Sequence, residues 1–168
     1  MKRQYKILLL VFLAALFFMV AMPKVEDLYR REVAKKVVER WKAIAEKYAA
    51  AWKVDPKITL AIICQESGGN PDSVNPADPS RGLMQITPGA LADFNAAAGR
   101  SYTFEQMFDP YLNIEVGTWY FATRVAKTRN TNLALAAYNA GLGNLSAGAS
   151  YADKVERYLI HVSERYLI

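Results

Sequence analysis

The sequence from residue 58 to residue 66 reads Ile58-Thr59-Leu60-Ala61-Ile62-Ile63-Cys64-Gln65-Glu66. A helix with this sequence is apolar almost all round, so we expect it to be buried at the centre of the domain. Asp55-Pro56 precedes it, and proline in the first turn is typical of a helix start. The sequence therefore predicts a central helix that runs from Pro56 to about Ser67.

The carboxyl of Glu66 continues the apolar face of this helix, because Ile58, Ile62 and Glu66 are spaced by four residues. Burying an unpaired carboxylate destabilises a fold by roughly several kcal/mol, unless the carboxylate takes up a proton. The negative end of the helix dipole raises the pKa of Glu66 further. This setting suits a general acid. The alternative is a glutamate that reaches into solvent at the helix end, and spacing alone favours neither.

The rest of the chain beyond residue 54 predicts helices and loops, with no strand alternation. Glycine, proline and short polar residues fill residues 68–82, which are typical of a loop. Further helices are predicted after Thr87-Pro88, after Asp109-Pro110, from Leu133 to Tyr138, and from about Tyr151 to the end. The fold class is therefore all-α.

An unbroken apolar run of sixteen residues extends from Ile7 to Met22, with basic residues before it and Pro23 after it. This pattern is typical of a secretory signal. The residues before Pro23 make a poor cleavage site, so an uncleaved signal anchor in residues 1–23 is favoured over a cleaved signal peptide. A buried helix of a cytosolic protein is disfavoured because the run has no polar face.

Residues 24–50 predict a basic amphipathic helix. One face would pack on the domain, and another would lie on an anionic membrane surface. The catalytic domain is expected to cover residues 51–168.

Charge is unevenly distributed. Residues 1–53 hold 12 basic and 5 acidic residues, whereas residues 54–168 hold 9 and 11. A nucleic-acid-binding domain would carry the basic excess itself, so we expect no nucleic-acid partner. The chain has one cysteine, Cys64, and one histidine, His161, which excludes a disulfide framework and a Cys/His zinc site.

Four ordered motifs resemble the lytic transglycosylase family, in its soluble-transglycosylase-like catalytic domain. The resemblance covers about residues 52–160 and implies the helical fold of goose-type lysozyme. The motifs are Glu66-Ser67-Gly68-Gly69-Asn70-Pro71, Gly82-Leu83-Met84-Gln85-Ile86-Thr87-Pro88, Phe108-Asp109-Pro110 with Asn113-Ile114, Gly117 and Tyr120, and Ala136-Ala137-Tyr138-Asn139-Ala140-Gly141 followed by Tyr151 and Lys154-Val155.

The resemblance implies that Glu66 is the single catalytic acid/base. It implies substrate-binding roles for Met84, Gln85, Tyr120, Tyr138, Asn139 and Tyr151. Simpler roles are open for four of them: a loop cap for Gln85, a helix C-cap for Asn139, and packing for Tyr120 and Tyr151.

Two positions depart from the family pattern. Asn75 stands where many members have serine, and Ala147 where many have glutamate. If a member of this family contacts the peptide attached to its glycan substrate, other residues of this chain must make that contact.

The activity implied is non-hydrolytic cleavage of the bond between N-acetylmuramic acid and N-acetylglucosamine in peptidoglycan, with no metal or cofactor. We expect an inner-membrane anchor and a periplasmic catalytic domain. One alternative is a hydrolytic muramidase that uses Asp72 or Asp78 as a second carboxylate. The other is a non-catalytic glycan-binding subunit of an envelope machine.

Overall fold

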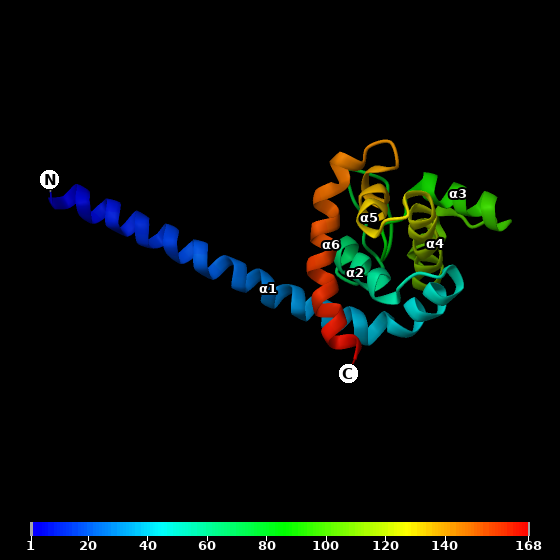
Figure 1. Cartoon of the computed structure of the whole chain (residues 1–168), viewed down its shortest axis with the longest axis horizontal. Helices are drawn as coiled ribbons and strands as arrows, with labels where there is room; N and C mark the ends of the chain where they lie inside the picture. Colours follow the sequence, from blue (N-terminus) through cyan, green and yellow to red (C-terminus); the bar gives the residue numbers. More distant parts are fainter. Residues whose placement is uncertain (1, 168) are drawn as a thin grey trace.

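The computed structural model describes residues 2–167 and shows a helical domain with one helix projecting from it (Figure 1). The described residues form no β-strand and contain only two isolated bridges, both at Arg81. The helices are α1 Lys2–Trp52, α2 Pro56–Ser67, α3 Pro88–Ala98, α4 Pro110–Thr128, α5 Thr131–Ala140 and α6 Leu145–Tyr166, with a 3-10 helix, η1 Phe104–Phe108, before α4.

The starts of α2, α3 and α4 follow one local rule. Each has proline in its first turn and a capping side chain before it, from Asp55, Thr87 and Asp109 respectively. The cap accepts a hydrogen bond from a backbone N–H that has no partner inside the helix. These three predicted starts are confirmed.

Helix α2 lies at the centre of the domain, as predicted. Leu60, Ile62 and Ile63 have no exposed surface, and α2 packs against both α1 and α6. Cys64 is buried in the same core, where burial raises the pKa of its thiol. The thiol is therefore a packing group.

Helix α1 continues through Pro23, the residue that follows the apolar run, as one helix. Proline removes one hydrogen bond and crowds the preceding turn. That local cost does not end a helix with long helix-forming segments on both sides. The helix that carries the apolar run is therefore the same helix that enters the domain.

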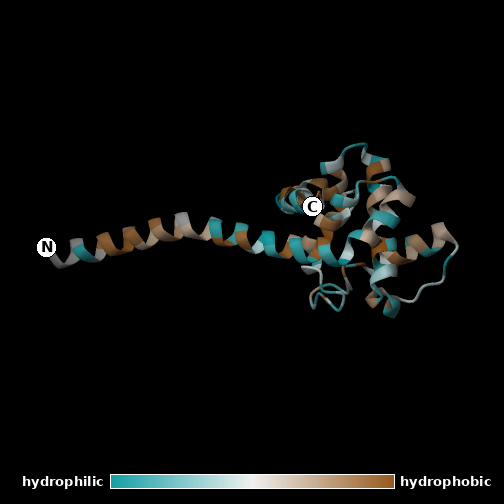
Figure 2. Ribbon diagram, turned by 90° about the horizontal axis from the view of Figure 1, so that it is seen from below, coloured by the Kyte–Doolittle hydropathy of each residue, from teal (hydrophilic) through white to brown (hydrophobic). Residues whose placement is uncertain are grey.

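The two halves of α1 differ in environment. Large apolar side chains between Leu8 and Met19 are exposed, whereas Val33, Val37 and Trp41 are buried against the domain. Figure 2 shows the apolar half projecting freely. By length and composition, this is a helix able to cross a membrane. The predicted packing of residues 24–50 on the domain is correct for the part from Val33 onward.

Helix α6 starts at Leu145, earlier than the predicted start at Tyr151. Gly148 lies in its first turns and allows close approach to α5, since a Cβ here would lie 2.1 Å from the Ala136 carbonyl oxygen. The absence of a side chain at Gly148 thus lets α5 and α6 pack closely.

Candidate active site

Glu66 lies in the last turn of α2, where its half-buried carboxyl faces α6. The phenol of Tyr151 donates a hydrogen bond of 2.5 Å to Glu66 Oε1. Burial raises the pKa of Glu66 to about 7, although the hydrogen bond from Tyr151 acts in the opposite direction. Among the described residues, no basic side chain pairs with this carboxyl. The group is thus held near the point of half-protonation at neutral pH.

Glu66 opens into a cleft of about 360 Å³ between the end of α2, the loop that follows it, and α5. The lining is mainly polar and includes a second carboxylate but no basic side chain. We call this the catalytic cleft. Its lining residues are Glu66, Ser73, Val74, Asn75, Pro76, Asp78, Ser80, Gln85, Thr87, Tyr138 and Asn139.

The end of α2 is fixed by Ser67, which the sequence analysis did not single out as functional. Its hydroxyl lies 2.8 Å from the Leu83 carbonyl oxygen and 3.2 Å from that of Ile63, and it accepts a hydrogen bond from the Gly69 N–H. These contacts tie the helix end to the segment carrying Gln85. The position of the Glu66 carboxyl relative to the cleft wall is therefore set by its sequence neighbour.

Three tyrosines pack together beside Glu66, and Tyr138 is the one among them that borders the catalytic cleft, so neither Tyr120 nor Tyr151 lines it. The Tyr138 and Tyr151 rings lie 6.3 Å apart and are inclined by 17°, and the Tyr138 hydroxyl donates to the Met84 carbonyl oxygen at 2.7 Å. The ring centroids of Tyr120 and Tyr138 lie 5.5 Å apart, with the two rings inclined by 75°. Burial is the main cause of the raised pKa values of Tyr138 and Tyr151, so both phenols stay neutral hydrogen-bond donors.

Gln85 borders the cleft, but its amide is already engaged by the protein. Its Oε1 accepts from the Ser80 hydroxyl at 2.9 Å, and its Nε2 donates to the carbonyl oxygens of Ser73 and Gly82 at 3.1 and 2.9 Å. Its backbone φ is +48°, a strained value for glutamine. The loop-cap role left open for Gln85 fits this geometry, and the amide shapes residues 73–82 around the cleft.

A sugar contact through the Met84 side chain is wrong for this structure. Met84 has no exposed surface, and its side chain packs against Gly117, where a Cβ would lie 2.5 Å from the sulfur. Tyr120 does not border the cleft either. It packs between Tyr138 and the guanidinium of Arg124, so the packing role left open for it fits.

Asn139 is exposed on the cleft wall at the end of α5. The C-cap of α5 is Gly141, so the C-cap alternative for Asn139 is wrong. Asn75 also borders the cleft, and its Oδ1 accepts from the Ala77 N–H at 3.0 Å. Of the two carboxylates considered as a partner for Glu66, Asp78 borders the cleft and Asp72 does not.

Asn113 was named only as part of a motif, yet its side chain holds the backbone segment that carries Gln85. Fully buried, it accepts from the Met84 N–H and donates to the carbonyl oxygens of Arg81 and Met107, each at 2.8 Å. An asparagine within an apolar helix is the signal that could have marked it. Among the described residues, no group of three or more His, Cys, Asp or Glu is arranged to hold a metal ion.

Comparison with known proteins identifies the family of this chain. A family model described as "Transglycosylase SLT domain" matches residues 43–160. The endo-type membrane-bound lytic murein transglycosylase A of Salmonella paratyphi B is 36% identical over 97 residues, which are 56% of this chain and 47% of that protein. The protein of the same name from Salmonella typhimurium matches equally. The chain spans about half the length of these relatives.

Two solved structures are similar. The 70 kDa soluble lytic transglycosylase of Escherichia coli has a TM-score of 0.67 at 26% identity, over 78% of this chain and 25% of that one. An inactive mutant of lytic transglycosylase Slt from Pseudomonas aeruginosa has a TM-score of 0.69 at 22% identity, over 76% of this chain and 24% of that one. The expected all-α, lysozyme-like fold is confirmed.

Proposed function

Because this chain belongs to the transglycosylase SLT domain family, we propose that it is a peptidoglycan lytic transglycosylase in which Glu66 is the single acid/base. The observation that carries the proposal is the half-buried carboxyl of Glu66, with its pKa raised to about 7, at the wall of a polar cleft. A group near half-protonation at neutral pH can give a proton and then take one.

The proposed reaction has two proton transfers. Neutral Glu66 donates its proton to the glycosidic oxygen as the bond to C1 of N-acetylmuramic acid breaks. The resulting carboxylate takes the proton of the C6 hydroxyl on the same sugar, and that oxygen closes on C1. The products are a 1,6-anhydro end and a free sugar hydroxyl, so no water is consumed and Glu66 regains its proton.

The surroundings of Glu66 support both steps. Burial favours the neutral acid before the first transfer, whereas the hydrogen bond from Tyr151 stabilises the carboxylate formed by it. The cleft lining contains no basic side chain that would hold Glu66 permanently ionised. A single carboxyl with these two opposed influences is suited to change its protonation state twice in one cycle.

Polar groups of the cleft are the proposed sugar-binding residues. Asn139 and Asn75 present amides at the wall, and Tyr138 presents part of an aromatic ring. Amides both donate and accept, as the hydroxyl and acetamide groups of the substrate require. We assign positioning roles to Gln85, Tyr120 and Met84, because each contacts the residues that shape the wall.

Hydrolysis of the same bond is the second candidate, since Asp78 borders the cleft together with Glu66. A hydrolase uses its second carboxylate to activate water or to attack the sugar. Digestion of purified peptidoglycan followed by mass analysis of the released sugars separates the two. Anhydro ends support the transglycosylase, and ends heavier by one water refute it.

Two variants complete this test. Glu66→Gln should lower the rate by about 10²–10⁴-fold, the usual contribution of a general acid/base. Asp78→Asn should leave anhydro ends as the product, whereas a hydrolase would lose activity. Unchanged activity of Glu66→Gln would refute the role of Glu66. Absence of any cleavage by the wild-type chain would favour the non-catalytic glycan-binding alternative.

We further propose that the apolar half of α1 anchors the chain in the inner membrane, with the catalytic domain on the periplasmic side. The exposed apolar side chains from Leu8 to Met19 support the anchor. The peptidoglycan substrate supports the orientation. The accessibility of Lys127, exposed on α4, to a membrane-impermeant amine reagent in intact spheroplasts tests that orientation. Labelling supports it, and labelling only after lysis refutes it.

A further inference from the structure

Another pocket lies outside the catalytic cleft, where α1, α2 and α6 meet. It has a volume of about 330 Å³ and shares no lining residue with the cleft. We call it the basic pocket. Its lining residues are Glu26, Tyr29, Arg30, Gln65, Lys154, Arg157 and Tyr158.

Three cations and one carboxylate line the basic pocket. Glu26 is already paired with Arg30, at 2.7 Å between Oε2 and Nη2. Within the described residues, no carboxylate lies within 4.0 Å of the Lys154 or Arg157 side-chain nitrogens. Two exposed cations of α6 therefore line the pocket without a protein counter-ion, and the positive potential that they create favours an anionic ligand.

The position of the basic pocket along α1 suggests where this anion comes from. Arg30 follows Met22, the end of the apolar run, by eight residues of the same unbroken helix, or about 12 Å. The run itself spans roughly 24 Å, less than the ~30 Å of a bilayer's hydrocarbon core, so that core reaches a few ångströms beyond Met22. Arg30 then lies at the depth of the lipid headgroups.

The surface between the apolar run and the pocket also fits lipid. Val25, Leu28 and Tyr29 are 57–63% exposed on α1, within this interval. Figure 1 shows α6 crossing α1 where the free half of α1 meets the domain. The cations of α6 line the same pocket as Glu26, Tyr29 and Arg30 of α1, and therefore lie beside the part of α1 from which the proposed membrane anchor continues.

We propose that the basic pocket binds the phosphate of an anionic phospholipid headgroup, with Lys154 and Arg157 as its donors. This inference rests on the membrane anchoring proposed above. The bound headgroup fixes how the chain is rotated about the axis of α1 relative to the membrane. It also holds α6 against the membrane surface. A carboxylate of the peptidoglycan stem peptide is the weaker candidate, because the pocket does not join the catalytic cleft.

The test uses the full chain in nanodiscs made either of phosphatidylcholine alone or of phosphatidylcholine with phosphatidylglycerol. Phosphatidylglycerol should raise the unfolding temperature of the wild-type domain by roughly 4 °C, as expected for two cations that each meet a headgroup of net negative charge, whereas the phosphate of phosphatidylcholine is neutralised by its own choline. Lys154→Glu/Arg157→Glu should abolish that shift. Lys154→Gln/Arg157→Gln, which introduces no repulsion, should abolish most of it.

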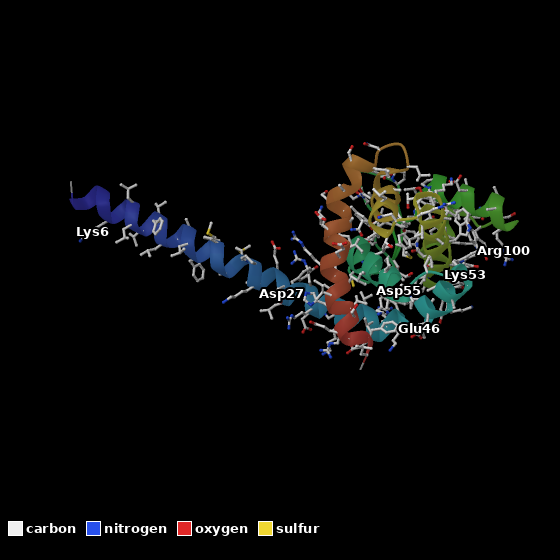
Figure 3. The ribbon with its side chains drawn as sticks, viewed as in Figure 1. Lys6, Asp27, Glu46, Lys53, Asp55 and Arg100 are labelled. Atoms are coloured by element: carbon white, nitrogen blue, oxygen red, sulfur yellow. The ribbon has the colours of Figure 1, made fainter. Side chains whose placement is uncertain are left out.

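The matched control reverses two exposed cations elsewhere, Arg100→Glu/Lys127→Glu, and should keep the full shift. Figure 3 shows Arg100 at the end of the domain opposite the free half of α1. If both charge-reversal variants lose the phosphatidylglycerol-dependent shift equally, the lipid acts on diffuse surface charge and the proposed binding in the basic pocket is wrong. A shift produced by soluble muramyl dipeptide in phosphatidylcholine discs would overturn it in favour of the stem peptide.

Failure of the anchoring gives a different result. A chain that does not remain with discs of either composition refutes the membrane anchor, and with it the lipid ligand of the pocket. A chain that remains with both discs but shows no dependence on phosphatidylglycerol refutes the pocket alone.

Discussion

The phenol of Tyr151 and the carboxyl of Glu66, 85 residues apart in the sequence, are joined by a hydrogen bond of 2.5 Å. The bond crosses from α6 to the end of α2 and stabilises the ionised form of Glu66, whereas burial of the carboxyl stabilises the neutral form. Burial is the larger influence, so the pKa stays near 7. Two opposed influences on one carboxyl make the pH dependence of the proposed cleavage a direct test of the site.

The rate of cleavage should fall as pH rises through about 7. The first step needs neutral Glu66, and the fraction of neutral carboxyl falls tenfold per pH unit above its pKa. In Tyr151→Phe the hydrogen bond that lowers this pKa is absent. The falling limb of kcat/KM should therefore move to higher pH, in addition to any loss of rate. The measurement is the pH profile of muropeptide release by both proteins.

Tyr166→Phe is the matched control for that experiment. It also removes a phenol that donates to a carboxylate, Glu46 Oε1 at 2.7 Å, but at a surface away from the cleft. Its pH profile should overlay that of the wild type. A shift in the control as large as that of Tyr151→Phe would contradict the assignment of the limb to Glu66.

Glu66→Gln should stabilise the fold at neutral and higher pH. The ordinary pKa of glutamate is 4.5 and that of folded Glu66 is about 7, so the unfolded chain ionises first as pH rises. The stability contributed by the neutral carboxyl is full below about 4.5 and lost by about 7. In thermal unfolding in micelles, the unfolding temperature of Glu66→Gln relative to that of the wild type should rise between pH 4.5 and about pH 7. Glu32→Gln, which removes a carboxyl that the fold does not bury, is the control.

Local rules in the sequence were sufficient for most of the helices. Asp55-Pro56, Thr87-Pro88 and Asp109-Pro110 each combine a cap with a first-turn proline, and each starts a helix. The four-residue spacing of Ile58, Ile62 and Glu66 predicted that they share one face of the helix, because that depends only on helix geometry, but it did not decide whether the carboxyl is buried or reaches into solvent.

Contacts between distant segments could not be predicted in this way. The amide of Gln85 has its donors and acceptors in residues 73–82, and that loop's path is set by tertiary packing. Tyr151 was expected to begin a helix, but Gly148 extends α6 toward Leu145 because it packs on Ala136. Met84 matched a cleft motif, yet its backbone carbonyl, and not its side chain, contacts the tyrosine stack.

Gly148→Ala should destabilise the protein and lower its activity. The added methyl would lie 2.1 Å from the Ala136 carbonyl oxygen, a backbone atom that cannot turn aside. Overpacking of this kind costs about 1–3 kcal/mol, and it would push α5, with Tyr138, away from Tyr151 on α6. Gly143→Ala, where a Cβ meets nothing within 4 Å, is the control. Gly148→Ala should lower both the urea midpoint of unfolding and the rate of muropeptide release. Gly143→Ala should change neither.

Asn113→Ala should lower stability through the segment that carries Gln85. The buried amide makes three hydrogen bonds of 2.8 Å, to the Met84 N–H and to the carbonyl oxygens of Arg81 and Met107. Removing it leaves three backbone groups without partners, for a loss on the order of 3 kcal/mol in the free energy of unfolding. Asn132→Ala, at an exposed position in α5, should change that free energy by less than about 0.5 kcal/mol. Equal urea midpoints for the two variants would mean that the Asn113 amide does not support this segment.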